Sequence, residues 1–583
     1  VLPLLNDFYN DIRQNKPLFE RIAKVKETSN PEDLTPEQQM LLDKTYKSFV
    51  RNGANLDERK QEELRRIDQE LTQLKLKFNK NVLKETNDFL LVIDNETDLE
   101  GLPGSAKQAA RQLAKSKGKS GWAFSLHAPS YIPFMKYIKN RDLRQQMALA
   151  YGSRSFKDNE YNNSDIVLNI AKLRQQRAQL LGYNTHADYV LEERMAETPK
   201  KVIDFLDQLY QAAYPKAQVE LKKLENLAQK DGIDKLEKWD VSYYMNILKK
   251  QELDLDEEQL KAYFPLENVL KGIFEIANKL YGLTFKETDQ IDKYHPDVKT
   301  FEVYDDQKNL TAVLYTDFFP RAGKRQGAWM TAYKPQWQKD GQNNRPHISI
   351  VTNFTPPIET EPSLLTFNEV TTLFHEFGHA LHGMMAQTTY PSLSGTNVYW
   401  DFVELPSQIM ENWAYEKEAL DLFAKHYKSG EVIPQELIDS IKKSLQFMEG
   451  YATNRQLSFG YLDMGWHYYF NPEMDTNVSD FEEQQMAKTQ ILPYHKNNNM
   501  SVAFSHIFSG GYAAGYYSYK WAEVLDADAF AYFKEKGIFN KEVAKKFKKL
   551  LESGGTKHPM ILYKEFRGRE PKVEALLKRA GLI

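Results

Sequence analysis

The segment from His375 to His379, His-Glu-Phe-Gly-His, has the clearest capacity for chemistry in this 583-residue chain. Two histidines four positions apart lie one above the other on the same face of a helix. At this spacing, two imidazole nitrogens can bind one metal ion at about 2.0–2.1 Å. Glu376 points to the side of the histidine pair, where a carboxylate can take a proton from a metal-bound water. The segment therefore predicts a catalytic zinc site with Glu376 as general base.

A helix is expected around this segment, because apolar residues recur there at helical spacing, at Val370, Leu373, Phe374 and Phe377. The alternative interpretation is a core helix that carries two surface histidines. A helix that only packs has no need of His, Glu and His together, so the metal interpretation is favoured. His382 lies one turn beyond His379, and we expect it to pack or to support the site without binding the metal.

A catalytic zinc ion needs a third protein ligand, which is usually a carboxylate when the first two are histidines. Glu404 follows His379 by 25 positions, and helical spacing places Gln408 and Glu411 on the same side as Glu404. The flanking residues are mostly apolar, and a buried carboxylate requires a cation. We therefore predict one Zn²⁺ per chain, bound by His375, His379 and Glu404. A solvated acidic face remains the alternative, above all for Glu411.

A segment rich in glycine and tyrosine lies near residues 505–519. Gly510 and Gly511 permit backbone shapes that other residues resist. Several ring side chains stand around them, at His506, Tyr512, Tyr516, Tyr517 and Tyr519. Hydrolysis of an amide creates an oxyanion that neutral donors stabilise in a water-poor site, so a mobile glycine hinge carrying phenols would suit that reaction. The alternative is a tight turn with packed tyrosines.

These motifs together resemble the thimet oligopeptidase family of zinc metallopeptidases. The resemblance rests on segments 375–379, 402–413, 327–330, 506–519 and 566–571, and it extends only loosely to the helical N-terminal part. It implies a mostly α, zincin-type fold with two helical lobes around a deep channel and a small β-sheet next to the zinc helix. It also implies short peptide substrates and, as we expect, a monomer.

The resemblance further suggests roles for individual residues. His506, Tyr512 and Tyr519 would line the substrate cleft, and Tyr516 or Tyr519 would assist the oxyanion. Gly327 and Ala328 would let a substrate backbone approach a sheet edge, because their side chains are small.

Within the family, the segment from Leu393 to Asn397 looks most like the bacterial peptidyl-dipeptidases, or dipeptidyl carboxypeptidases. The predicted function is therefore zinc-dependent hydrolysis of short peptides, with release of dipeptides from the free C-terminus. Such a reaction needs a cation for the terminal carboxylate, and the candidates are Arg321, Lys324, Arg325, Arg567 and Arg569. The alternatives are an endo-acting oligopeptidase and a non-catalytic helical protein with a structural zinc. Glu376 argues against the last, since a structural site has no use for a base.

Composition excludes several other classes of function. Hydrophobic residues make up 41% of the chain and the net charge is −4, so there is no basic field for nucleic acid. We find no apolar run of about 18 residues, which predicts no membrane span. The lack of cysteine leaves histidines and carboxylates as metal ligands.

The chain begins with Val1 and family members look longer, so a leading segment is expected to be missing. The sequence is compatible with either a cytoplasmic or a periplasmic location in a bacterium.

We expect a helical N-terminal lobe over residues 1–195 and a catalytic lobe over 196–583. Long helices are predicted over 56–83 and from Thr198, with a kink or restart at Pro215 and an end at Asp231-Gly232. Strands are expected only in a small sheet between about 300 and 355, at 301–304, 310–315, 327–333 and 347–351.

Overall fold

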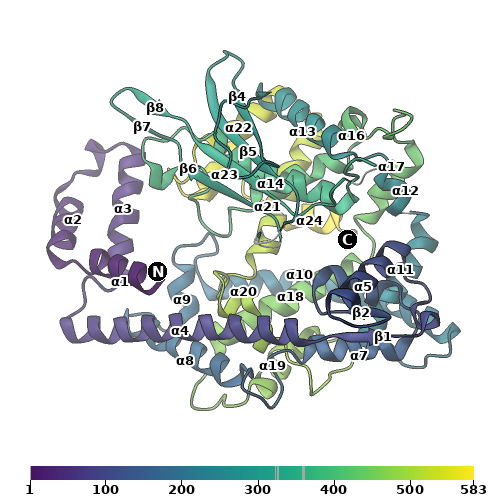
Figure 1. Cartoon of the computed structure of the whole chain (residues 1–583). Coiled ribbons are helices and arrows are strands. Elements are labelled where there is room, and N and C mark those ends of the chain that lie inside the picture. The colour runs from purple at the N-terminus through teal and green to yellow at the C-terminus, as the bar shows by residue number, and fades with distance from the viewer. Residues whose placement is uncertain (1, 256, 322–323, 325–326, 358–360) are drawn as a thin grey trace.

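The computed structural model describes residues 2–255, 257–321, 324, 327–357 and 361–583 (Figure 1). The chain folds into a mostly helical molecule with one small mixed sheet. In the view of Figure 1, the sheet and the helices packed on it form the upper part, and the long helix α4 runs along the base. None of the described helices combines the length and the apolar character that crossing a membrane requires.

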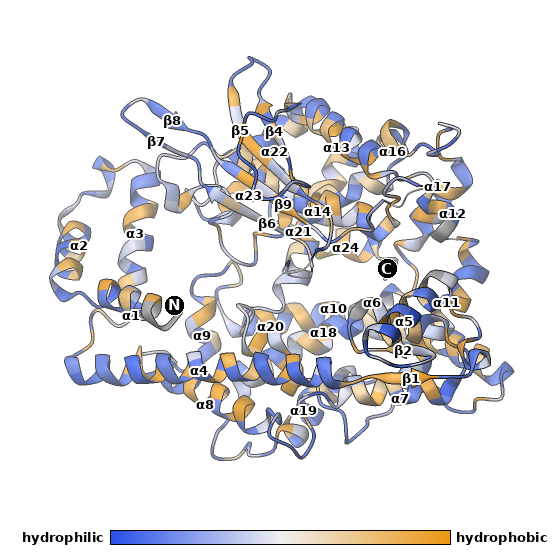
Figure 2. Ribbon diagram, viewed as in Figure 1, coloured by the Kyte–Doolittle hydropathy of each residue, from blue (hydrophilic) through white to orange (hydrophobic). Residues whose placement is uncertain are grey.

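The N-terminal part consists of helices and two very short strands. Its elements are α1 (Leu2–Arg13), α2 (Lys16–Thr28), α3 (Pro36–Val50), α4 (Glu58–Asp88), β1 (Leu91–Ile93), α5 (Gly104–Ser116), β2 (Trp122–Phe124), α6 (Ala128–Tyr137), α7 (Arg141–Gly152), α8 (Ser164–Leu180) and α9 (His186–Leu191). Helix α4 begins where Asp57 accepts a hydrogen bond from the Lys60 amide, and it buries an apolar stripe that includes Leu64 and Ile67. Its other faces are hydrophilic (Figure 2).

Four helices lead from this part to the sheet: α10 (Pro199–Lys230), α11 (Lys238–Leu253), α12 (Glu257–Lys261) and α13 (Leu266–Tyr281). Thr198 caps α10 and Pro199 occupies its first turn, as predicted. The helix ends at Lys230, next to the predicted Asp231-Gly232 stop. The expected restart at Pro215 is wrong, because α10 continues through this proline. Burial of one face of α10 against α18 supports the helix across the missing hydrogen bond.

The main sheet has five strands in the order β3-β4-β5-β9-β6. They are β3 (Thr284–Glu287), β4 (Lys299–Tyr304), β5 (Leu310–Asp317), β6 (Trp329–Lys334) and β9 (His347–Val351), and a separate ribbon joins β7 (Trp337–Lys339) to β8 (Gln342–Asn344). Strands β5 and β9 are parallel, and the other neighbours are antiparallel. Strand β6 therefore lies at one edge.

The four predicted strands are present, but the expectation that strands occur only between 300 and 355 is wrong. Strand β3 lies earlier and pairs with β4, and β1 pairs with β2 far from the main sheet. Both β1 and β2 have three residues, which is too short for an alternating pattern to stand out from the surrounding helical sequence.

The C-terminal part is helical. Its helices are α14 (Phe367–Met384), α15 (Leu405–Glu411), α16 (Lys417–Phe423), α17 (Gln435–Ser444), α18 (Glu449–Met464), α19 (Val478–Met486), α20 (Ser505–Phe508), α21 (Ser518–Lys536), α22 (Lys541–Glu552), α23 (Pro559–Arg567) and α24 (Val573–Arg579). Hydrophobic residues are concentrated in α14 and the strands beside it (Figure 2). The predicted helix around the His-Glu-Phe-Gly-His segment is therefore α14, packed on the sheet.

Helix α14 begins with a reciprocal cap. Thr366 accepts a hydrogen bond from the Glu369 amide at 3.1 Å, and Glu369 accepts one from the Thr366 amide at 2.8 Å. The helix then buries Val370, Leu373 and Phe374 completely. These residues belong to the largest apolar core, which also includes residues of β5 and β9. The helix that carries the histidines is therefore anchored at its start and along one face.

The apolar cores join segments that are far apart in the sequence. One core combines residues of α4 and α8 with residues between Phe459 and Phe508. Another combines α9 and α10 with α18, α21 and α24. The division into lobes at residues 195 and 196 stays a prediction.

Candidate metal centre

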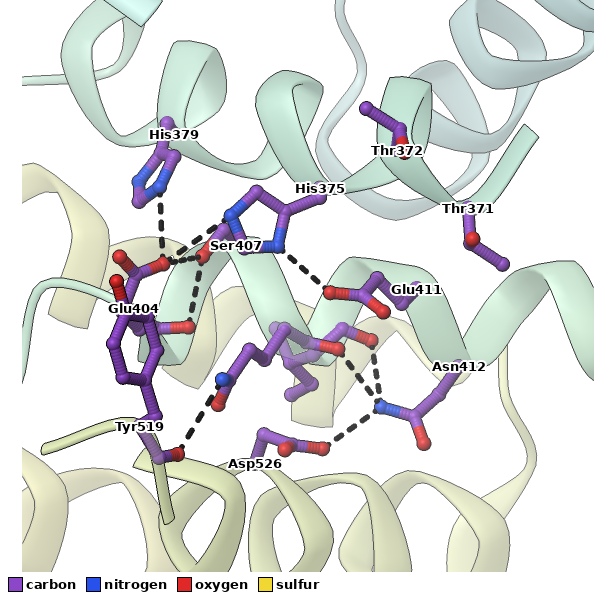
Figure 3. A network of polar contacts seen from close by, with 12 residues as sticks. Thr371, Thr372, His375, His379, Glu404, Ser407, Glu411, Asn412, Tyr519 and Asp526 are labelled. Carbon is purple, nitrogen blue, oxygen red and sulfur yellow. Dashed lines mark hydrogen bonds and ion pairs between the residues drawn. The ribbon is translucent and has the colours of Figure 1, made fainter. Parts of the chain in front are cut away.

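Three side chains that could hold a metal ion converge where α14 passes over the start of α15 (Figure 3). The Nε2 atoms of His375 and His379 lie 3.3 Å and 3.2 Å from the same oxygen, Oε2 of Glu404. One donor atom from each residue lies within 4.8 Å of the others. Two imidazoles and one carboxylate form the donor set of catalytic zinc sites that keep a fourth position for water. The residues present therefore fit a zinc ion.

Glu404 immediately precedes α15 and occupies its N-cap position. Ser407 donates a hydrogen bond to Glu404 Oε2 at 2.8 Å, so the carboxylate is held from within its own turn. Its pKa is well below the ordinary value: burial alone would raise it, but hydrogen bonds from His375 and His379 lower it. Glu404 is thus held as a carboxylate that faces both histidines.

Gly378 explains how the two helices approach so closely. A Cβ atom at this position would lie 2.1 Å from the Pro406 carbonyl oxygen and 2.6 Å from Ser407 Cα. Real side chains never come so close to backbone, so only glycine fits between the two histidines here. Glycine at 378 lets α15 bring Glu404 to the histidine pair.

Glu411 is the last residue of α15, at the opposite end of the helix from Glu404, and it orients His375. Its Oε1 lies 2.7 Å from His375 Nδ1, which leaves Nε2 directed toward Glu404 (Figure 3). A carboxylate on the second ring nitrogen fixes the tautomer and orientation of a metal-binding histidine. Burial would lower the pKa of His375, but Glu404 and Glu411 together raise it to about 10. A solvated acidic face, the alternative for Glu411, does not describe this contact.

Gln408 takes no part in the donor cluster. Its side-chain amide lies 3.5 Å from the backbone oxygen of Tyr519, so it connects α15 to α21. Asn412 makes a similar connection at 3.0 Å to Asp526, which also pairs with Arg579. The residues around α15 therefore fix its position against the C-terminal helices.

Glu376 lies beside the histidines on α14 and is 5% exposed. Burial raises the pKa of its carboxyl group. Its Oε2 atom is buried and has no hydrogen-bond partner in the described part of the chain. A buried carboxylate oxygen without a partner is costly in a purely structural residue, and it fits a group that exchanges a proton with a water or substrate.

His382 is fully buried, and its ring nitrogens have no hydrogen-bond partner among the described residues. Burial, together with the nearby His379, lowers its pKa to about 3, so its ring is neutral. The ring packs inside the core and stays outside the donor cluster, as predicted.

The rings of the glycine- and tyrosine-rich segment form one cluster. Tyr512 and Tyr519 stack with ring centroids 4.9 Å apart, and Tyr516 meets Tyr519 edge-on at 5.3 Å. The ring centroid of His506 lies 5.8 Å from that of Tyr512 and 6.0 Å from that of Tyr516. Burial raises the pKa of Tyr516 to about 12 and also raises that of Tyr519, with Tyr512 and Glu404 contributing to the latter. The phenols are thus neutral donors, and Glu404 lies close enough to influence them.

The conformation of this segment does not depend on left-handed glycines. Gly510 and Gly511 are absent from the positive-φ residues, whereas Ala514 has a φ of 50°. Gly510 is needed for space, because a Cβ there would lie 2.8 Å from the His506 carbonyl oxygen. The predicted role of the two glycines in unusual backbone shapes is therefore wrong, and close packing is the physical reason for Gly510.

A buried polar chain holds the segment in place. Asp463 on α18 accepts hydrogen bonds at 2.8–2.9 Å from three consecutive amides, those of Ala514, Gly515 and Tyr516. Its Oδ1 lies 2.8 Å from His467 Nδ1, and His467 Nε2 lies 2.7 Å from Arg174. These bonds offset the strain at Ala514 and orient the tyrosines.

Sequence reasoning missed this chain, although one signal was present. Asp463 near the end of α18 and His467 in the helical turn that follows stand four positions apart in an apolar stretch, where charged residues require partners. Arg174 closes the chain from α8 by donating to the carbonyl oxygens of Ile507 and Phe508 at 2.7 and 3.1 Å. Arg174 lies 333 positions before Ile507, so the sequence alone did not predict this contact.

Four of the five candidate cations for a substrate carboxylate already have carboxylate partners. Arg321 and Lys324 both pair with Asp317. Arg567 and Arg569 both pair with Asp528. The fifth candidate, Arg325, lies outside the described residues.

Gly327 and Ala328 directly precede the edge strand β6. Gly327 has a φ of 99°, and its carbonyl oxygen accepts a hydrogen bond from Asn353 at 2.8 Å. The unpaired edge of β6 offers backbone groups that an extended peptide can bind. The predicted contact with substrate at this edge stays a prediction.

Comparisons with known proteins agree with this geometry. The model of peptidase family M3 matches residues 134–582. Oligopeptidase A of Haemophilus influenzae is 39% identical over 590 aligned positions, which cover 100% of this chain and 87% of that protein. Oligopeptidase A of Escherichia coli is 38% identical, again with 100% of this chain and 87% of that protein covered. Dipeptidyl carboxypeptidase of Escherichia coli is 34% identical, with 99% of this chain and 85% of that protein covered.

The fold is also similar to solved structures. PZ peptidase A, solved with an inhibitor, superposes with a TM-score of 0.58 and 15% identity over 99% of this chain and 85% of that one. A putative oligoendopeptidase F gives a TM-score of 0.57 and 15% identity over 99% of this chain and 83% of that one.

Proposed function

Because this chain belongs to peptidase family M3 and is a metallopeptidase of oligopeptides, we propose that it is a zinc-dependent endopeptidase that cleaves short peptides internally. The observation that carries the proposal is the convergence of His375, His379 and Glu404, with Glu376 beside them. A bound zinc ion would polarise the scissile carbonyl and make a water acidic enough to react near neutral pH.

The residues of the chain have distinct parts in this proposal. Glu376 takes the proton from the attacking water and returns it to the leaving amine. Burial raises the pKa of its carboxyl group above the ordinary value, which makes it a stronger proton acceptor. The phenols of Tyr516 and Tyr519 donate hydrogen bonds to the developing oxyanion. The edge of β6 holds the peptide backbone as an added strand.

Internal cleavage is favoured over dipeptide release, which reverses the expectation drawn from Leu393 to Asn397. The oligopeptidase A relatives share more identity with this chain than the dipeptidyl carboxypeptidase does. The segment also has a packing role that is independent of specificity. A Cβ at Gly395 would lie 3.1 Å from Gly383 Cα, so this glycine lets the segment pack on α14.

Internally quenched peptides of one sequence, with a free or an amidated C-terminus, test the proposal when the products are identified by mass spectrometry. We expect internal cleavage of both forms. Release of a dipeptide from the free form alone would assign the chain to the dipeptidyl carboxypeptidase branch. Cleavage of neither form would favour a helical protein with a structural metal. A Glu376→Gln variant serves as the control for contaminating peptidases.

A further inference from the structure

A cavity of about 740 Å³ lies behind the glycine- and tyrosine-rich segment. Its walls come from α4, α8, α9 and the segment from Gly510 to Ala513. Figure 1 shows α4 running beneath α9 and α20, and the cavity lies in this region. Its volume is in the range of pockets that enclose small ligands or a few residues of a peptide.

The lining of this cavity has a large excess of positive charge. Six arginine and lysine residues line it, against two carboxylate residues: Arg13, Arg66, Lys75, Arg174, Arg177 and Arg194 face Asp68 and Glu70. Asp68 is already paired with Arg177 at 2.7 Å. Glu70 is exposed to solvent. Arg13 and Arg66 are exposed as well, so the cations that lack water and have little compensation from within the cavity are Lys75, Arg174 and Arg194.

Lys75 and Arg194 show this lack of compensation most clearly. Lys75 is half-buried and forms no ion pair with the described residues. Burial and the charges of Arg174 and Arg177 lower its pKa to about 8. Arg194 donates from Nη1 to the Glu193 carbonyl oxygen at 2.8 Å, and its charge acts on the buried Asp401. Its Nε atom, however, is buried and lacks a hydrogen-bond partner in the described part of the chain. Withdrawing such groups from water is unfavourable unless an anion binds them.

Arg174 connects the cavity to the catalytic cluster. Its guanidinium group donates hydrogen bonds to the carbonyl oxygens of Ile507 and Phe508 and to His467. The two carbonyl oxygens are neutral groups, and the His467 ring is neutral when it is not protonated. The cavity wall at Gly510 and Gly511 continues directly into Tyr512, which stacks on Tyr519. An occupant of the cavity would lie next to the segment that carries the proposed oxyanion donors.

From these contacts we propose that the cavity is a subsite for a carboxylate of the peptide substrate, bound by Lys75 and Arg194. Lysine and arginine recognise carboxylates through charge-assisted hydrogen bonds. The carboxylate is either an Asp or Glu side chain or the peptide C-terminus, since both present the same group. The inference rests on the proposed function, because it assumes that the occupant is the peptide being cleaved.

The test uses pairs of internally quenched peptides that differ only by Glu or Gln at one position, scanned along the sequence. A second pair differs by a free or an amidated C-terminus. The quantity measured is the ratio of kcat/KM for the charged and neutral members of each pair, so a partly inactive preparation does not affect it. The variants are Lys75→Met, the charge-preserving Lys75→Arg, and Lys77→Met as a matched control. Lys77 lies on the same helix but is exposed and outside the cavity.

We expect the wild-type chain to prefer the charged member by roughly tenfold in one pair. Lys75→Met is expected to bring this ratio close to one, while Lys75→Arg and Lys77→Met keep it. The pair that responds identifies the carboxylate as side chain or terminus. A wild-type ratio near one in every pair, or a preference that Lys75→Met leaves intact, would overturn the proposal.

The two proposals can fail separately. If the wild-type chain cleaves none of the peptides, the proposed function fails. Peptides of the same sequences that carry a single fluorophore and no quencher are then compared by fluorescence anisotropy for binding. In that case, a charge preference that depends on Lys75 would support the carboxylate site alone, and equal binding of both members would overturn it.

Discussion

At the scale of single residues, the metal centre depends on where each side chain finds its partner. His375 and His379 share one oxygen of Glu404, and Glu411 orients His375 from behind. Glu376, one position from His375, is buried and has an oxygen without a partner in the described structure. Adjacent residues on one helix thus serve different purposes because they point in different directions.

Replacement of Glu376 by Gln is expected to keep zinc and fold while lowering kcat by about 10²–10⁴-fold. The amide has nearly the same shape but cannot take a proton near neutral pH. Steady-state kinetics on an internally quenched peptide, with zinc content measured by elemental analysis, checks this outcome. Turnover at the parent rate would show that Glu376 is not the base.

Replacement of Tyr519 by Phe is expected to lower kcat by about 10²–10³-fold with little change in zinc content. The ring is retained, so its stack on Tyr512 can persist while the phenol donor is lost. Tyr469→Phe is a suitable control, because Tyr469 is an exposed residue far along the chain from the cluster. Unchanged kinetics in Tyr519→Phe and in Tyr516→Phe would leave these tyrosines with packing roles only.

At the scale of elements, the site is a contact between α14 and the start of α15. The repeat of apolar residues and the spacing of the histidines were sufficient to predict α14. They could not predict that Glu404 occupies the N-cap position of α15 with its carboxylate held by Ser407, because this contact depends on the local turn. Nor could they predict that Gly378 is required by the Pro406 carbonyl, which comes from a different element.

Gly378→Ala is expected to separate α14 from α15 and to weaken zinc binding. The added methyl group meets backbone atoms that cannot rotate away, and overpacking of this kind typically costs about 1–3 kcal/mol. Gly383→Ala on the same helix is the control, since its Cβ would meet the ends of Ile348 and Met330, which are flexible side chains. Thermal unfolding and zinc titration compare the two variants. Equal effects would argue against a special role for the contact at Gly378.

The end of β5 provides a prediction about acid stability. Burial would raise the pKa of Asp317, but Arg321, Lys324 and Tyr294 lower it to about 2. A carboxyl group with a lowered pKa stabilises the folded state at neutral pH, and this contribution is lost as the pH falls from about 4 toward 2. A pKa lowered this far corresponds to on the order of 2 kcal/mol of stability at neutral pH.

The stability difference between the wild-type chain and Asp317→Asn should therefore shrink as the pH falls from about 4 toward 2. Urea unfolding at several pH values measures this difference. Asp306→Asn, which changes an exposed carboxylate, is the control. A difference that stays constant with pH would show that the ion pairs at Asp317 do not depress its pKa.

At the scale of the whole molecule, segments distant in the sequence build the surroundings of the site. Arg174 on α8 supports residues 507 and 508, and Asp463 on α18 holds residues 514–516. The sequence predicted the mostly helical fold, the strands between 300 and 355 and the convergence of His375, His379 and Glu404, because each depends on local spacing or motif. Their binding of a metal stays a prediction. The sequence did not predict these long-range bonds, because a partner far along the chain leaves no periodic pattern. It also missed strand β3, because four mostly exposed residues are too few for an alternating pattern to stand out.

The central claim is that His375, His379 and Glu404 hold one zinc ion and that this ion is required for peptide hydrolysis. Titration of the metal-depleted protein with zinc tests it most directly, with hydrolysis of an internally quenched peptide followed at each addition. We expect activity to rise linearly and to level off at one equivalent per chain, and His379→Ala to regain almost none. Full activity in the metal-depleted protein, or full recovery by His379→Ala at one equivalent, would contradict it.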